Sequence, residues 1–336
     1  MVALALWKLK ILIALLFLAF IIAAAIRPSV DALKRRGIPR GAGVLLHYFV
    51  LAGIVGLSLW AVVPRAIDQI ELALGGEVPT SSEEVAAAAR DSTGLKKDVL
   101  EAARDWLERL PSGEQFVDPA LELTLITVEI FIGMFFVLAS AAYWIFERDR
   151  AVTLVTRTLP RPRRKIVRDT WDLIDLKLGA YVRGQGILVV LVATTLSIIF
   201  WAIGLPFWLL VGVFAGVVEL IPVIGPLTAG AVAVGVGLTE SWQLALAAGV
   251  AVLVVRLLED YIIIPRVLGE AVGLSPLLVL VAVSTAAILF GGWSVLLAIP
   301  LAAVIATLFQ VIVLNVDPSE EEVPAVIFSP TERETV

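Results

Sequence analysis

Three charged residues stand close together in a strongly apolar part of the chain. Arg256, Glu259 and Asp260 are spaced i, i+3 and i+4, which places them on one face of a helix. A charge at the centre of a membrane helix costs about 2.5–3.5 kcal/mol on insertion scales, and such residues often mark a substrate or ion path. One arginine between two acids leaves a net negative charge, which suits a charged gate or a substrate or proton site. The alternative is a salt bridge near the membrane surface that only fixes helix packing.

A fourth acid lies beside a helix-breaking motif. Glu219 precedes Pro222, Gly225 and Pro226 in the stretch GVVELIPVIGPLTAG. Proline cannot donate an amide hydrogen, glycine permits unusual backbone angles, and Pro226 suits the first turn of a new helix. We therefore expect two half-helices here, whose freed carbonyls and positive helix end offer a site to a polar solute or ion. A plain turn between two short spans remains the alternative.

A second motif of the same kind follows the charged triad. In IPRVLGEAVGLSP, Pro265 and Gly269 echo Pro222 and Gly225, with spacings that differ by one residue. The pattern weakly indicates an internal repeat in the second half of the chain. It predicts a second break in helix geometry, placed directly after the charged face.

The composition defines the environment in which these residues must lie. The chain has 336 residues, of which 60% are hydrophobic and 17% are charged. Soluble domains are about 45–50% apolar and about 25% charged, so we expect an all-α polytopic membrane protein. Cysteine is absent and there is a single histidine, His47. These counts leave little from which to build a metal site or a catalytic dyad, and no phosphate-binding loop occurs. We expect no metal, no cofactor and no enzymatic activity.

Charge asymmetry orients the first half of the chain. A first apolar run, 11–26, is followed by the segment 27–41, which holds five Lys/Arg and one acid. A short loop this basic belongs in the cytoplasm. The second span, 42–63, leads into the acidic excursion 64–122, with six Lys/Arg and thirteen Asp/Glu, which we expect outside the cell as a helical hairpin.

The remaining segments complete the expected organisation. A third span, 123–146, precedes the segment 147–185, whose basic residues predict an amphipathic helix on the inner membrane face. Residues 186–218 carry no charge over 33 positions, which is too long for one span, so Gly204-Leu205-Pro206 must divide them. The acidic tail is expected to be disordered. The expected units are 1–63, 64–122, 123–146, 147–185, a transport core at 186–316 and the tail at 317–336.

Four motifs in this order resemble the AI-2E family, the autoinducer-2 exporter-like membrane proteins also called the PerM family. They are RPSVDALKRRGIPRG, ELIPVIGP, LLEDYIIIPRVLGEAVGLSPL and LFGGWSVLLAIPLAAVI, and the likeness covers nearly the whole chain. It implies a transporter of seven or eight spans in the plasma membrane of a prokaryote. Homo-oligomers, pentamers among them, are also implied. Members usually carry a further apolar span ahead of the one that ends in the basic loop. Only ten residues precede the run 11–26 here, so that first span looks missing or truncated.

Two functional hypotheses follow from the resemblance. The first is a secondary transporter or facilitator that exports a small polar organic solute, similar to autoinducer-2. The second is a Na⁺(Li⁺)/H⁺ antiporter that uses Glu219, Glu259 and Asp260 as titratable groups. Membrane lipids are expected partners and nucleic acid is not. Where the family pattern has glutamine and asparagine around Glu259, this chain has Arg256 and Tyr261, the positions expected to touch the substrate.

Overall fold

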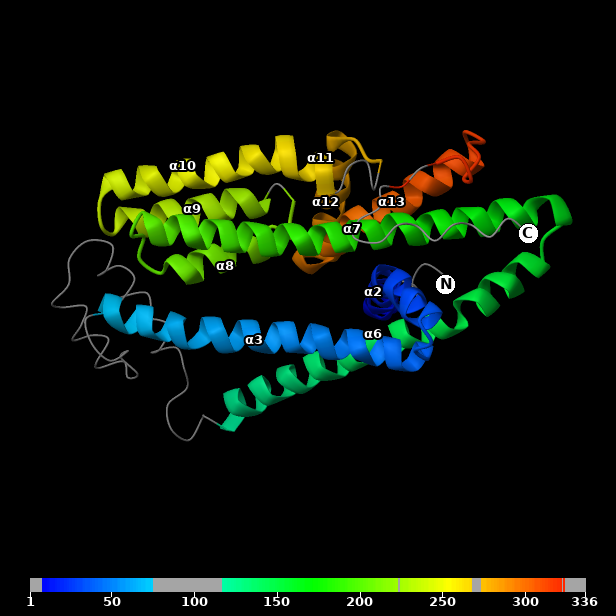
Figure 1. The fold of residues 1–336 in the computed structure, drawn as a ribbon, viewed down its shortest axis with the longest axis horizontal. Helices are drawn as coiled ribbons and strands as arrows, with labels where there is room; N and C mark the ends of the chain where they lie inside the picture. Colours follow the sequence, from blue (N-terminus) through cyan, green and yellow to red (C-terminus); the bar gives the residue numbers. More distant parts are fainter. Residues whose placement is uncertain (1–7, 75–116, 223, 268–272, 322, 324–336) are drawn as a thin grey trace.

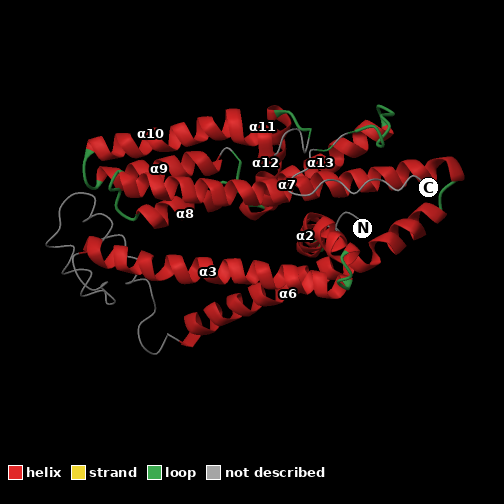
Figure 2. Cartoon of the chain, in the orientation of Figure 1, coloured by secondary structure: helices red, strands yellow, loops and turns green. Residues whose placement is uncertain are grey.

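A computed structural model of the chain describes residues 8–222, apart from 75–116, and residues 224–323, apart from 268–272 and 322. The described residues form helices joined by short loops and contain no strand (Figure 2). The expectation of an all-α fold is confirmed. The helices are α2 Lys10–Arg35, α3 Arg40–Leu74, α6 Val117–Arg157, α7 Arg161–Ala202, α8 Trp208–Val218, α9 Ile224–Leu238, α10 Trp242–Leu258, α11 Ile264–Val267, α12 Pro276–Phe290 and α13 Val295–Ile312.

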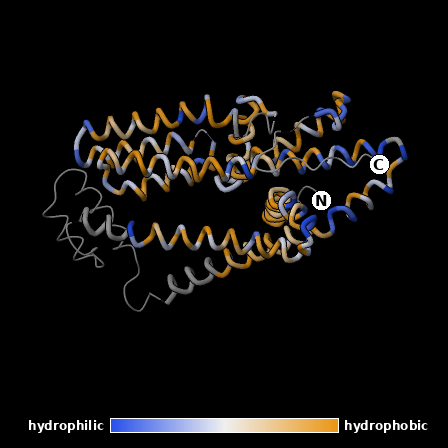
Figure 3. Tube along the Cα trace, viewed as in Figure 1, coloured by the Kyte–Doolittle hydropathy of each residue, from blue (hydrophilic) through white to orange (hydrophobic). Residues whose placement is uncertain are grey.

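Five of the described helices are long and apolar enough to cross a membrane. They lie in α2, α3, α6, α7 and the stretch from Gly292 to Ile312, whereas α8, α9 and α12 are apolar but shorter. Figure 1 shows α7 to α10 running side by side as one layer, with α3 and α6 below them and α2 nearly end-on between the layers. In Figure 3 hydrophobic residues dominate these helices, and hydrophilic residues gather near the turn between α6 and α7. The expectation of a polytopic membrane protein is confirmed.

The layer of α7, α8, α9 and α10 is held together by small residues at the helix contacts. A Cβ on Gly212 would overlap Ser197 of α7, and a Cβ on Gly237 would lie 2.5 Å from Ala245 Cα. Small residues let helix backbones approach closely where lipid supplies no hydrophobic driving force between helices. Buried apolar side chains, among them Phe200 of α7, then fill the space between the four helices.

Helix continuity departs from the expected segment boundaries. The basic segment 27–41 is not mostly loop, because α2 continues through Pro28 to Arg35. The helix that holds the second span continues beyond residue 63, because α3 passes through Pro64 and ends at Leu74. Most of the expected external hairpin lies outside the described residues. Charge alone does not end a helix, and i,i+4 pairs such as Arg27 with Asp31, at 3.5 Å, help it to continue.

The segment 147–185 is not a separate helix on the membrane surface. Its first part completes α6 and its second part is the beginning of α7, which runs unbroken across position 186. Leu173 and Leu178 of this part of α7 are buried. Gly179 allows close contact with α2, because its Cβ would lie 2.5 Å from Ala24 O. Burial against α2 therefore gives this stretch a packing role that its basic composition conceals.

Two expected breaks are present. Helix α7 ends at Ala202, and Gly204, with φ +74°, turns the chain away from it. Helix α8 begins at Trp208, which confirms the division at Gly204-Leu205-Pro206. The chain also leaves helical geometry between Val218 and Ile224. By contrast, the described part of the acidic tail is packed against the body of the protein, so the expectation of disorder is wrong for Asp317–Glu321.

Candidate functional site

The break between α8 and α9 is built by close backbone contact. A Cβ on Gly225 would overlap the carbonyl oxygen of Val218, so only glycine lets the start of α9 lie on the end of α8. Gly225 has no positive φ, and its role is close approach rather than the unusual backbone angle expected from the sequence. Its N–H donates to Ile221 O at 2.8 Å, and Pro226 lies in the first turn of α9. Glu219 is thereby held at the junction.

A side chain of α7 stabilises the broken backbone. The last carbonyls of a helix have no partner within the helix and need an outside donor. Gln185 Nε2 donates to the main-chain oxygen of Glu219 at 3.0 Å. Sequence reasoning missed Gln185, since it appeared only as the last polar residue before the charge-free run. The sequence did offer a clue to the role of Gln185. A single amide side chain in an apolar helix needs a polar partner, and an expected helix break elsewhere offers one.

Arg256 contacts the other three charged residues of the predicted site. Its Nη1 lies 2.9 Å from Glu219 Oε1 and 3.3 Å from Glu259 Oε2, and its Nη2 lies 2.9 Å from Asp260 Oδ1. The i, i+3 and i+4 pairs are those expected from one helical face. The contact to Glu219 crosses from α10 to the end of α8. One guanidinium therefore faces three carboxylates, and the cluster keeps an excess of negative charge.

Burial singles out two of the carboxylates. Glu259 is 1% exposed and Glu219 is 7% exposed, whereas the Asp260 side chain is 41% exposed. Glu259 Oε1 is buried and has no hydrogen-bond partner among the described residues. A buried polar atom without a partner carries a desolvation cost of about 1–3 kcal/mol, and more when the group is charged. Such a group in a native fold is a candidate to receive a donor from a ligand.

The two buried carboxylates line a small pocket. Its room is about that of one water molecule. Pro226 of the first break also lines it, and apolar side chains of α7 and α10 complete the wall. The space is lined by Val192, Leu196, Ala215, Glu219, Pro226, Ala229, Val252, Val255, Arg256 and Glu259. The pocket as it stands is too small for a solute larger than water.

The second break begins earlier than the sequence indicated. Residues Glu259–Ile263 form a π-helical turn, in which the Ile264 N–H donates to Glu259 O, five residues back. Pro265 lacks an N–H for Tyr261 O and its ring would clash with that carbonyl, so the preceding turn widens. Pro265 itself lies inside α11, and Gly269 lies outside the described residues. The distortion therefore includes Glu259 and Asp260 of the charged triad and begins one turn after Arg256.

Two predicted site residues stand apart from this cluster. Tyr261 is 78% exposed, and Pro265 is also exposed. Neither lines the pocket beside Glu219 and Glu259. The structure thus brings together Glu219, Pro226, Arg256 and Glu259, with Pro222 and Gly225 shaping the backbone beside them.

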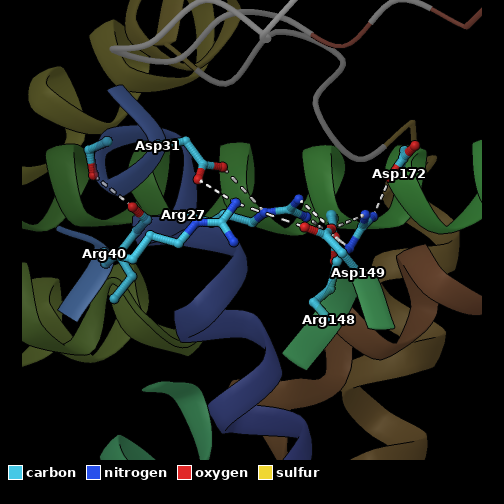
Figure 4. A network of polar contacts seen from close by, with 9 residues as sticks. Arg27, Asp31, Arg40, Arg148, Asp149 and Asp172 are labelled. Atoms are coloured by element: carbon cyan, nitrogen blue, oxygen red, sulfur yellow. Dashed lines mark hydrogen bonds and ion pairs between the residues drawn. The ribbon is translucent and has the colours of Figure 1, made fainter. Parts of the chain in front are cut away.

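A second ionic network, which the sequence did not predict, joins four helices (Figure 4). Arg27 of α2 lies 3.1 Å from Asp149 of α6 and 3.2 Å from Asp175 of α7. Arg148 of α6 is buried and pairs with Asp172 and Asp175. Arg40 of α3 and Asp31 of α2 complete it at 3.4 Å. In the sequence, this network is indicated only by single acidic residues within otherwise basic segments. In the structure, its ion pairs hold α2, α3, α6 and α7 together.

Apolar helices interrupted beside a buried ionic cluster define a class of membrane protein. Discontinuous helices of this kind form the solute and ion sites of secondary transporters, because irregular backbone inside a membrane requires a protein or aqueous lining. The sequence comparison agrees with this class. Residues 1–314 match the family profile described as AI-2E family transporter, and the chain belongs to that family.

Individual relatives cover most of the chain at low identity. YrrI of Bacillus subtilis (strain 168), a candidate transport protein, is 25% identical over 306 residues, which are 86% of this chain and 83% of YrrI. PerM of Escherichia coli (strain K12), a candidate permease, is 26% identical over 306 residues, which are 88% of this chain and 85% of PerM. The family supports a role in membrane transport. The protein is an integral membrane protein.

Proposed function

We propose that the protein is a secondary transporter or facilitator that exports a small polar organic solute, similar to autoinducer-2. The solute would cross near the junction of α8, α9 and α10. The observation that carries the proposal is Glu259, whose Oε1 is buried without a hydrogen-bond partner among the described residues and which lines a small pocket where two interrupted helices meet. A passing hydroxyl group would supply the missing hydrogen bond.

The charged residues take distinct parts in this proposal. Arg256 neutralises part of the charge on Glu219 and Glu259, which keeps two buried acids close together without a resident cation. Glu259 would hold the solute through its free oxygen. Asp260, at the more exposed edge, would meet the solute before or after that contact.

The backbone residues of the first break supply the means of opening. Gly225 rests on Val218 O, and Gln185 anchors the Glu219 carbonyl. We infer that α9 moves relative to α7 and α8 at this junction while the helices themselves stay intact. Because the pocket beside Glu219 and Glu259 has room for only about one water, transport of a larger solute requires that movement. The alternating states would differ in whether the space between α8, α9 and α10 is open.

The test uses everted membrane vesicles with autoinducer-2 as the probe. Uptake into such vesicles corresponds to export from the cell, and pH and sodium gradients are imposed separately. Glu259→Gln keeps the shape of the side chain and removes its charge, and Glu240→Gln is the matched control in the exposed turn after α9. We expect protein-dependent uptake that Glu259→Gln reduces and Glu240→Gln leaves unchanged. Uptake equal to that of vesicles without the protein would refute export of this solute class.

A further inference from the structure

The chain beyond α13 folds back onto the body of the protein. Asp317 organises a turn, because its Oδ1 accepts from the Ser319 N–H at 2.8 Å and its main-chain oxygen accepts from the Glu320 N–H at 3.2 Å. Pro318 in this turn is fully buried. We call the described residues Asp317–Glu321 and Val323 the C-terminal strap. Burial of Pro318 shows that the strap belongs to the packed structure.

The strap neutralises a buried lysine of α7. Lys177 is 3% exposed, and its Nζ lies 2.6 Å from Glu321 Oε1. The same ammonium donates to Thr307 Oγ1 of α13 at 3.3 Å. Within the described chain this is the one ion pair of Lys177. Since a buried charge is costly unless it is paired, the strap adds an ionic contact to the apolar packing of α13 on α7.

An apolar contact extends the same attachment along α7. Val323 packs with Ala180, which is buried, and Ile187 contributes to the same small cluster. Lys177, Ala180 and Ile187 are spaced i, i+3 and i+10, so they share one face of the helix. The strap therefore holds α7 at both a charged and an apolar point.

The stretch of α7 beneath the strap also supports both helix breaks. Gln185 donates to Glu219 O at the first break. Tyr181 and Leu188 lie in one cluster with Ile221 of the first break and Ile264 beside the π turn. Eight residues of helix separate Lys177 from Gln185, about 12 Å. Figure 1 shows α11, α12 and α13 gathered beside the middle of α7.

We propose that the C-terminal strap is an autoinhibitory latch. While docked, it fixes α13 to α7 and restrains the rearrangement of the α8–α9 junction that opening requires. Its release raises the rate of transport. The effect on transport rests on the function proposed above, whereas the mechanical link between strap and junction does not.

The first test measures the link without any solute. Hydrogen exchange is followed over peptides of the α8–α9 junction in purified Glu321→Gln protein, with Glu320→Gln as control, because Glu320 is exposed and forms no ion pair in the described structure. We expect exchange at the junction to rise by about fivefold or more in Glu321→Gln, at the low end of typical coupling between sites. Equal exchange in the two variants would overturn the link.

The second test locks the strap by cross-linking. The chain contains no cysteine, so Ala180→Cys with Val323→Cys introduces a single pair at a native contact. We expect a disulfide to form in the folded protein, uptake of autoinducer-2 by everted vesicles to fall, and reductant to restore it. A disulfide that forms without affecting uptake, or a pair that fails to form in folded protein, overturns the latch. If the parent shows no autoinducer-2 uptake, the proposed function fails and the exchange experiment still decides the latch.

Discussion

Replacing Arg256 by methionine would leave two buried carboxylates without their counter-charge. Met retains most of the side-chain volume but cannot contact Glu219 at 2.9 Å or Glu259 at 3.3 Å. Removing one partner of a buried ion pair costs about 3–5 kcal/mol. The third pair, to Asp260, adds little because that side chain is 41% exposed, and exposed pairs contribute about 0–1 kcal/mol. We therefore expect a loss of about 3–5 kcal/mol of stability.

Thermal unfolding in detergent, followed by the amount of monodisperse protein, measures this loss. One kcal/mol corresponds to about 2–4 °C in proteins of moderate size, so the midpoint should fall by on the order of 10 °C. Arg35→Met, at an exposed position, is the control and should lie within about 0.5 kcal/mol of the parent.

A triple variant separates charge from packing. Arg256→Met combined with Glu219→Gln and Glu259→Gln removes both stranded charges, so most of the lost midpoint should return. If Arg256→Met alone melts within about 2 °C of the parent, the reasoning is refuted, because the loss of stability would then be about 1 kcal/mol at most. A triple variant no more stable than the single one would show that the loss does not come from uncompensated charge.

Three further predictions test the break, its anchor and the orientation of the chain. Gly225→Ala should destabilise the folded protein by about 1–3 kcal/mol in thermal unfolding, because its Cβ overlaps Val218 O, whereas Gly235→Ala in the same helix has open space and should be neutral or stabilising. Gln185→Leu should reduce vesicle uptake and increase hydrogen exchange at the α8–α9 junction, since Glu219 O loses its donor; unchanged exchange would contradict this role. Ser81→Cys should react with an impermeant reagent in intact cells, and reaction only after permeabilisation would reverse the orientation inferred from charge.

The sequence predicts local features of the site well. Pro222 and Gly225 marked a break because their effects on the backbone act within one turn. The spacing of Arg256, Glu259 and Asp260 likewise determines which side chains share a helical face. The second break was predicted close to its place, but Pro265 distorts the turn that precedes it. The π turn therefore lies at Glu259–Ile263 rather than at the proline itself.

Contacts between distant segments escaped prediction. Glu219 and Arg256 are 37 positions apart, and their pairing depends on how α8 meets α10. Gln185 resembles any isolated polar residue until its contact with Glu219 O is known. Lys177 belongs to a segment that looked exposed because it is basic, and its partner Glu321 lies in a tail whose composition indicated disorder. In each case the tertiary partner, rather than local propensity, decides the environment.

Vesicle uptake by Glu259→Gln tests the central claim most directly, because that substitution alters the buried carboxylate oxygen that lacks a partner. The measurement is the initial rate of autoinducer-2 uptake per folded protein, from pH 5.5 to 8.5, compared with the parent and with Glu240→Gln. The account predicts a folded Glu259→Gln protein with a reduced rate and an altered pH dependence, beside a normal Glu240→Gln. A Glu259→Gln protein that matches the parent throughout this range would contradict the account and assign the ionic cluster to structure alone.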